Sequence, residues 1–255
     1  MQFIRDSLLI FRRQASVSLR NPAWVIIGLT WPVLYLAFFG PLFSSLFSGG
    51  MPDVPRVNPY GFYVPGLLVQ LGLFGTSFVG LNVIVDWREG VLERLRVTPV
   101  SRLAILAGRV LRDAIVLLVQ AAVLVLAGVV AGLRAPVGGV LIGLGFIAVL
   151  AVSLAAFSYA LGLLTKAEDV LAPLLNMVMV PMMLLSGILL PMTLGPGWLQ
   201  AVARIIPFGY IIQAMRDAFS GRYLTVAMAQ GAGVAVVLAA LCLLLGARVF
   251  VREHA

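Results

Sequence analysis

The sequence predicts an all-α polytopic membrane protein with six transmembrane helices. The first observation is composition: 62% of the 255 residues are hydrophobic, 11% are charged, and the mean hydropathy is +1.08. Soluble domains carry about 25% charged residues. The second observation is six stretches without charge, at 21–52, 57–85, 114–133, 135–165, 170–203 and 223–247. Each can hold the roughly 20 residues that a helix needs to cross a bilayer, and strand-like alternation is absent.

Residues 1–22 are expected to form an amphipathic helix on the membrane surface. One helical stripe is apolar, with Ile4, Leu8, Phe11, Ala15 and Leu19. The opposite side is basic, with Arg5, Arg12, Arg13 and Arg20. This pattern suits a helix whose arginines lie near anionic headgroups. The early charges also interrupt the apolar core that a cleavable signal peptide requires.

The six spans are expected at 23–46, 61–85, 108–132, 138–164, 170–192 and 225–247. The segment 47–59 between the first two is rich in glycine and proline, which is typical of a loop. The most densely charged part of the chain, 86–102, separates the second span from the third. Ser101 is positioned to cap the helix that follows it. Short turns at 134–136 and 165–169 join the next spans.

Basic residues set the expected orientation, because cytoplasmic loops carry an excess of Lys and Arg. With six spans and a cytoplasmic amino terminus, 13 of the 18 Lys and Arg residues fall inside and five fall outside. Both termini are therefore predicted to be cytoplasmic. The net charge of +8 is interpreted as this orientation signal, and no nucleic-acid partner is expected.

The segment 193–222 tests the number of spans. Eleven uncharged residues lie between Arg204 and Arg216, which is too few for a crossing, and Pro207 interrupts them. A seventh crossing would also place the basic carboxyl terminus outside. We therefore expect two short helices that dip into the outer leaflet and return, with Trp198 and Tyr210 near the interface. A plain surface loop is the alternative.

Catalytic chemistry is not expected, because catalysis needs positioned acids, bases, nucleophiles or metals. The single histidine, His254, is the next-to-last residue, and Cys242 is the single cysteine. The carboxylates are too scattered for a typical metal site. The only lysine, Lys166, does not follow a phosphate-binding glycine loop. A function driven by nucleotide hydrolysis must therefore take its energy from another subunit.

Ion-coupled transporters usually bury ionisable residues in mid-membrane. Here Asp86 and Asp113 lie at predicted span ends. The middles of the spans hold no ionisable residue, and Gln70, Asn82 and Asn176 are candidates for contact with a substrate. Hydrogen bonding between helices is their alternative role. An uncharged, fairly apolar pathway favours a hydrophobic or amphiphilic cargo.

Two segments are more specific than composition. The first is WREGVLERLRVTPVSRLAILAGRVLRD at 87–113, which begins with a short charged helix that ends at Thr98-Pro99. A solvated loop helix is its alternative interpretation. The second is SGILLPMTLGPGWLQAVARIIPFGYIIQAMRDAFSG at 186–221. Its candidate residues for the re-entrant hairpin are Pro191, Trp198, Pro207, Phe208 and Tyr210.

Together these segments resemble the type-2 ABC exporter permease family, which includes daunorubicin-resistance-type drug exporters of bacteria. The resemblance covers essentially the whole chain, and the run EGVLERLRVTP at 89–99 is its most specific part. It implies a single permease domain over 1–255 in the bacterial plasma (inner) membrane. Within it, 1–22 is the interfacial helix, 86–100 a cytoplasmic coupling helix, and 193–222 the re-entrant external segment.

The resemblance also implies partners. In this family the coupling helix sits in a cleft of a separate ATP-hydrolysing subunit, and the matching residues here are Arg88, Glu89, Glu93, Arg94 and Arg96. Two copies of that ABC ATPase, which use ATP and magnesium, and a second permease, identical or paralogous, are implied. This chain is expected to bind no cofactor or metal itself. The family's substrate path lies between the two permeases, along spans one, two and five.

The residues leave two other classes of function open. One is an ion-coupled secondary transporter that needs no ATPase, and the other is a membrane scaffold or sensor that transports nothing. Co-purification with an ATPase discriminates against both. The cargo is not implied, because the family includes drug, lipid and polysaccharide exporters.

Overall fold

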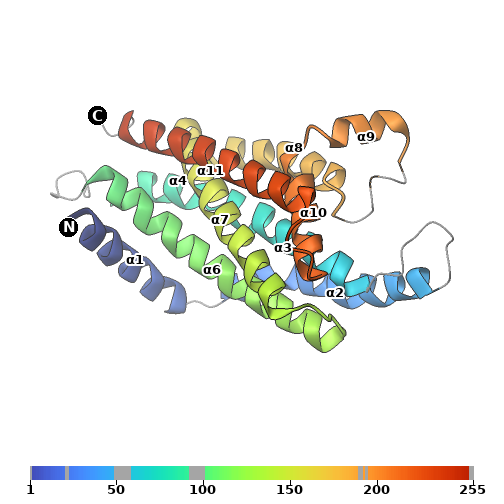
Figure 1. The fold of residues 1–255 in the computed structure, drawn as a ribbon. Helices are drawn as coiled ribbons and strands as arrows, with labels where there is room; N and C mark the ends of the chain where they lie inside the picture. Colours follow the sequence, from blue (N-terminus) through green and yellow to red (C-terminus); the bar gives the residue numbers. More distant parts are fainter. Residues whose placement is uncertain are drawn as a thin grey trace.

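The structure is a computed structural model, and it describes residues 2–20, 23–48, 59–91, 101–188, 192 and 195–252. The regular structure of these residues is helical (Figure 1). The helices are α1 (Gln2–Arg20), α2 (Ala23–Ser48), α3 (Pro59–Ser77), α4 (Gly80–Arg88), α6 (Arg102–Ala131), α7 (Val137–Thr165), α8 (Glu168–Leu185), α9 (Gly197–Ala203), α10 (Pro207–Phe219) and α11 (Val226–Arg252). The predicted all-α membrane fold is confirmed.

Five helical segments among the described residues are long and apolar enough to cross a membrane. They are Pro59–Arg88, Leu103–Ala131, Val137–Thr165, Glu168–Leu185 and Val226–Phe250. They correspond to the second to sixth predicted spans. The first predicted span corresponds to α2, a helix of 26 residues whose sequence carries no charge. Its apolar segment with described side chains is Ile26–Leu42. The chain is therefore a multi-pass membrane protein, and its sixth crossing stays a prediction.

The start of α6 differs from the expected start of the third span at 108. The helix begins at Arg102, because the Ser101 hydroxyl accepts a hydrogen bond from the Ala104 N–H at 3.2 Å and caps it. The earlier start moves Arg109 and Asp113 from the expected end of a span into the body of a helix. Both side chains are buried there.

The end of α8 also differs from the expected span, 170–192. The helix stops at Leu185, and Gly187 then adopts a left-handed φ of 76°. A left-handed glycine is a common way to end a helix, because it carries no Cβ that would clash. The chain therefore leaves α8 about two turns earlier than hydropathy alone predicts.

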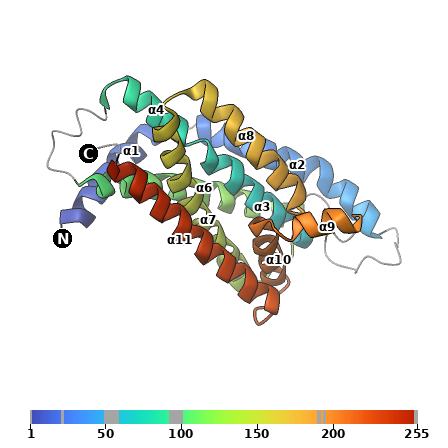
Figure 2. The same cartoon turned by 90° about the horizontal axis from the view of Figure 1, so that it is seen from above.

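The centre of the bundle is α7, which contacts α3, α4, α6, α8, α10 and α11. Its buried neighbours come chiefly from α3, α6 and α10. Representative core residues are Leu67 and Leu68 of α3, Leu117 and Leu124 of α6, and Ile147 and Leu150 of α7. The apolar core thus runs along α3, α6 and α7 and includes the buried side of α10, and the other helices pack around it (Figure 2).

The amino-terminal helix α1 packs on the first half of α6. Gly108 permits this contact, because a Cβ there would lie 2.8 Å from the Ser7 carbonyl oxygen. Leu8 and Leu9 point away from the bundle and are 52% and 58% exposed. An apolar side of α1 is therefore left for lipid, as an interfacial helix requires, and the position of α1 in the membrane stays a prediction.

The two ends of the bundle carry different elements (Figures 1 and 2). Helix α1, the last turn of α4, the start of α6 and the end of α11 lie at one end, referred to below as the terminal end. Helices α9 and α10 lie toward the other, the hairpin end. On the predicted orientation the terminal end is cytoplasmic.

Helix α10 is an integral part of the bundle. Pro207 stands at its start, where a proline costs no hydrogen bond and its fixed φ suits a helix. Phe208 is 2% exposed, and the helix packs against α3, α7 and α11. The interpretation of 193–222 as a plain surface loop is therefore wrong for this part. Two short helices are present, as predicted.

Helix α9 contrasts with α10 because none of its residues is buried. Trp198 is 69% exposed. The turn between the two helices is closed by the Tyr210 hydroxyl, which donates to the Arg204 carbonyl oxygen at 2.9 Å. Pro191 lies outside the described residues. The depth of this hairpin in the membrane stays a prediction.

Candidate functional site

The second predicted span is broken at Phe78 and Val79, where α3 ends and α4 begins. Ser158 of α7 stabilises the break. Its hydroxyl donates to the Ser77 carbonyl oxygen and accepts from the Gly80 N–H at 2.9 Å. These bonds satisfy backbone groups that the interrupted helix leaves unpaired. Helix α4 is therefore a separate short segment attached to α7.

The backbones of α4 and α7 touch at two glycines. A Cβ at Gly162 would lie 2.5 Å from the Gly80 carbonyl oxygen, and a Cβ at Gly80 would overlap the backbone of Ser158. Small residues allow this close approach between membrane helices. The start of α4 is consequently held against α7 without intervening side chains.

The end of α4 is joined to α6 by a buried ion pair. Arg109 Nη1 lies 2.6 Å from Asp86 Oδ2, and the two side chains are 4% and 25% exposed. Removing either charge from such a pair leaves its partner poorly solvated, which is why a single substitution is costly. The pair therefore fixes where the chain leaves the bundle after α4.

A second carboxylate extends this cluster toward α7. Asp113 is 4% exposed, accepts a hydrogen bond from the Tyr159 hydroxyl at 2.5 Å, and lies 2.5 Å from Arg112 Nη1. With Asp86 and Arg109 it makes a cluster of two carboxylates and two guanidinium groups. The formal charges cancel, so the cluster links α4, α6 and α7 without a net charge.

The last turn of α4 also contacts the loop between α7 and α8. Lys166 Nζ lies 5.8 Å from the centre of the Trp87 ring, within cation–π range. Arg88 Nη1 lies 3.0 Å from Glu168 Oε1 at the start of α8, and both side chains are about half exposed. Three consecutive residues, 86 to 88, thus reach three neighbouring elements.

The five expected contacts with an ATPase follow directly on this turn. Arg88 ends α4, Glu89 is exposed, and Gly90 adopts a left-handed φ of 69°, so the chain changes direction here. The expected coupling helix, 86–100, therefore starts inside α4. Glu93, Arg94 and Arg96 lie outside the described residues. The assignment of all five to a partner stays a prediction.

The three candidate substrate contacts do not form one surface. Ser77 Oγ lies 3.5 Å from Met179 Sδ, so Met179 of α8 lies at the same depth in the bundle as the end of α3. Asn82 and Asn176, each about one turn from that contact, are both exposed at a similar depth. Gln70 is buried two turns away in α3, and its Oε1 accepts no hydrogen bond from the described residues.

Arg216 is a buried arginine at the hairpin end. It is 7% exposed and holds α10 to two other elements: its Nε donates to the Phe62 carbonyl oxygen at 3.1 Å, and its Nη2 donates to the Gly187 carbonyl oxygen at 2.8 Å. The guanidinium also lies 3.5 Å from the centre of the Phe62 ring. Burial lowers the pKa of Arg216 to about 9, so the side chain remains cationic at neutral pH.

Sequence reasoning assigned no role in a site to four residues that organise these sites, namely Arg109, Asp113, Tyr159 and Arg216. A signal for the first two was present, because residues four apart share one face of a helix. An oppositely charged pair on an otherwise apolar helix indicates a buried network. For Arg216 the signal is an arginine at the end of an apolar run that is too short to span.

The arrangement links the end of α4 mechanically to its neighbours. Within the described ranges, no group of three or more His, Cys, Asp or Glu residues could hold a metal ion. The carboxylates of Asp86, Asp113 and Glu168 have arginine or tyrosine partners. What the site offers is a short helix fastened to three elements, followed in the sequence by a charged run that begins with the exposed Glu89.

Residues 6–220 match the protein family described as ABC-2 type transporter. The putative transport permease ycf38 of Cyanophora paradoxa is 28% identical over 220 residues, which cover 86% of this chain and 75% of the relative.

Two further relatives carry drug-resistance names. The daunorubicin resistance ABC transporter permease protein DrrB1 of Streptomyces coeruleorubidus is 29% identical over 203 residues, which cover 78% of this chain and 70% of the relative. The probable doxorubicin resistance ABC transporter permease protein DrrC of Mycobacterium tuberculosis is 29% identical over 218 residues, which cover 84% and 76%.

Proposed function

Because the chain belongs to the ABC-2 type transporter family, we propose that it is the permease subunit of an ATP-driven exporter in a bacterial plasma membrane. It moves a hydrophobic or amphiphilic substrate out of the cytoplasm. Two copies of a separate cytoplasmic ABC ATPase bind ATP and magnesium and supply the energy. A second permease, identical or paralogous, completes the assembly.

The anchoring of the last turn of α4 carries this proposal. Asp86 pairs with α6, Trp87 contacts Lys166 after α7, and Arg88 pairs with Glu168 of α8. The charged run 89–99 follows immediately. A push on that run would therefore be delivered to several helices at once, which is what a lever between an ATPase and a membrane bundle requires.

The break between α3 and α4 would let such a push move α4 relative to α3. Helix α4 is joined to α3 only through the turn at Phe78 and Val79, which Ser158 holds by two hydrogen bonds. We expect ATP-driven closure of the partner subunits to move α4 with the attached ends of α6 and α8. Such a switch needs contacts that differ in free energy between the two states.

The nature of the cargo is proposed from the surface of α8, the fifth predicted span. From Val170 onward its exposed side chains are apolar, with Met177 78% exposed, except for Asn176. On α2, Trp31 and Phe38 are 68% and 71% exposed. An apolar face with an isolated amide suits a drug-like or lipid-like amphiphile, or the second permease that would enclose it.

The test is reconstitution of the chain with its ATPase. Replacing Glu89 and Glu93 together by alanine should abolish transport-coupled ATP hydrolysis or separate the subunits, because both would lie in the contact. Arg134→Ala, at an exposed position in the turn before α7, is the control and should leave coupling unchanged.

Full transport-coupled hydrolysis in the double variant would show that the lever is misassigned. Transport by the chain alone in liposomes with a proton gradient would favour an ion-coupled carrier instead. Association without any transport would favour a scaffold.

A further inference from the structure

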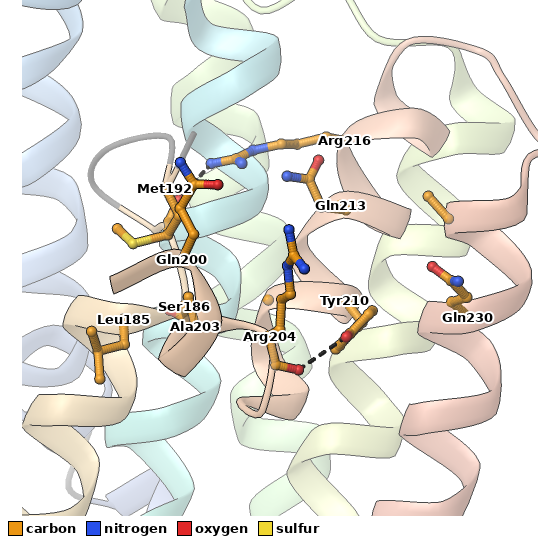
Figure 3. Close-up of a pocket in the computed structure, with 13 residues that line it drawn as sticks. Leu185, Ser186, Met192, Gln200, Ala203, Arg204, Tyr210, Gln213, Arg216 and Gln230 are labelled. Carbon is orange, nitrogen blue, oxygen red and sulfur yellow. Dashed lines mark hydrogen bonds between the residues drawn. The ribbon is translucent and has the colours of Figure 1, made fainter. Parts of the chain in front are cut away.

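A pocket of about 320 Å³ opens at the hairpin end (Figure 3). Its walls come from the turn after α8, from α9 and its following turn, from one side of α10 and from the start of α11. Its polar lining includes Ser186, Gln200, Arg204, Gln213, Arg216 and Gln230. The volume lies in the usual range for small-ligand pockets, roughly 300 to 1,000 Å³.

The pocket has a net positive charge. Two arginines line it, and no carboxylate is among the described lining residues. The nearest acid in sequence, Asp217, is engaged elsewhere, because it accepts hydrogen bonds from Arg222 at 2.6 Å and from Thr225 at 2.7 Å. The amide side chains add donors that can orient an anion without neutralising it.

The buried arginine is fixed in place before any ligand arrives. Arg216 donates to the carbonyl oxygens of Phe62 and Gly187, which are neutral acceptors. A guanidinium group has five N–H donors, and no carboxylate in the described part of the chain pairs with this one. A fixed guanidinium that keeps its charge is a strong recognition element for phosphate or carboxylate groups.

Two neighbouring features also favour binding of an anion in the pocket. Gly209 and Tyr210, in the first turn of α10, line the pocket, and the amino-terminal end of a helix carries a partial positive charge. In Figure 3 the side chains of Arg204 and Gln213 extend toward each other across the opening. Together with Arg216 they surround one small volume with donors.

The opposite face of α9 is apolar. Trp198, Val202 and Ile205 are 69%, 40% and 82% exposed, and their spacing places them on one side of α9 and its following turn. Gln200 and Arg204 lie on the side that lines the pocket. Within the pocket, Leu185, Met192 and Ala203 supply the apolar contacts for a ligand's tail, while the donors surround its head.

We propose that this pocket binds the phosphate-type anionic headgroup of an amphiphile, such as an acidic membrane lipid. The site is distinct from the α4 anchoring and does not depend on ATP-driven export. Cationic and zwitterionic heads are disfavoured, because two arginines remain without a neutralising partner among the described residues. Free phosphate-type anions share the head chemistry but lack the tail contacts with α9.

The full-length chain, purified in a neutral maltoside detergent, tests this by titration calorimetry. The probes are a short-chain phosphatidylglycerol, phosphatidylcholine of the same chain length, and glycerol 3-phosphate. We expect phosphatidylglycerol to bind at least about tenfold more tightly than phosphatidylcholine, because charge-assisted bonds go to the anion. If glycerol 3-phosphate binds more weakly than phosphatidylglycerol, the site is assigned to lipid. If the two bind equally, it is assigned to free anions.

Two variants at exposed positions separate binding from folding. Arg204→Gln removes one charge and Gln213→Glu places a carboxylate in the pocket at nearly constant volume. Each should weaken phosphatidylglycerol binding by about tenfold, while Arg134→Gln, which removes an exposed charge outside the pocket, should not. Equal affinity for the two lipids, or wild-type affinity in both pocket variants, would overturn the proposal.

Discussion

Both ends of the bundle bury an arginine, and they satisfy it in opposite ways. At the terminal end, Arg109 is paired with the carboxylate of Asp86. At the hairpin end, Arg216 is held by two backbone carbonyl oxygens and the ring of Phe62. The first arrangement cancels the charge, whereas the second fixes the position of the group and leaves its charge in place.

The difference teaches what each end is suited to do. A neutralised cluster joins helices and exerts little field beyond itself, so it fits a place where motion is passed between elements. An arginine whose partners are neutral projects its charge into the neighbouring pocket, so it fits recognition of an anion. Burial alone therefore does not reveal the role of an arginine; the charge of its partners does.

The largest effect on stability is expected from breaking the Asp86–Arg109 ion pair at the terminal end. Asp86→Leu should lower the free energy of unfolding by about 3 to 5 kcal/mol, because it leaves a buried guanidinium without its counter-charge. The measurement is unfolding of the purified chain by SDS in mixed micelles. Adding Arg109→Met should restore most of the loss. A single variant as stable as the wild type would show that Arg109 does not depend on this carboxylate.

The next effect concerns the contact between α4 and α7. Gly162→Ala should lower the free energy of unfolding by about 1 to 3 kcal/mol, because the new methyl group meets the Gly80 carbonyl oxygen. Gly145→Ala on the same helix is the matched control, since a Cβ there meets nothing within 4 Å. The control should be unchanged or more stable by up to about 1 kcal/mol. Equal effects of the two substitutions would argue against the backbone contact.

A smaller effect tests the neutral partners of Arg216. Phe62→Leu removes the ring below the guanidinium and should cost about 1 to 2 kcal/mol of stability, as expected for a desolvated cation–π contact. Phe157→Leu on α7, which is also half-buried, serves as the control for lost ring area. If both variants lose the same stability in the same SDS titration, the ring contributes packing and no interaction with the charge.

The smallest effect is expected at the exposed pair of the terminal end. Arg88 and Glu168 side chains are 53% and 42% exposed, so Arg88→Gln should change stability by about 0 to 1 kcal/mol. The same variant is informative for coupling, because Arg88 borders the charged run. Unchanged thermal unfolding together with impaired transport-coupled ATP hydrolysis would show that Arg88 acts in coupling to the ATPase and not in stabilising the fold. A stability loss as large as that of Asp86→Leu would contradict it.

The sequence predicted those parts of the fold that depend on local chemistry. Charge-free runs located five apolar helices that can span, Ser101 predicted a helix start that the structure confirms, and Pro207 predicted the division of the hairpin. The break at Phe78 and Val79 was not predictable, because neither residue is a turn former and the partner that holds it, Ser158, is about 80 residues away.

The candidate functional sites also depend on contacts between residues far apart in the sequence, which a local pattern does not predict. Charged residues next to a span could be counted from the sequence, but the pairing of Asp86 with Arg109 depends on how α4 and α6 lie together. The role of Arg216 depends on carbonyl groups, which every residue carries and no pattern marks. Three of the five expected ATPase contacts fall outside the described residues.

The contact of Lys166 with Trp87 gives the protein a built-in optical reporter. Lys166 is the sole lysine of the chain, so an amine-reactive dye can label one side chain in addition to the amino terminus. The dye would sit beside an indole, which quenches many fluorophores by electron transfer at short range. Emission would then brighten when the end of α4 parts from the α7–α8 loop, and a single purified chain could report that displacement in real time.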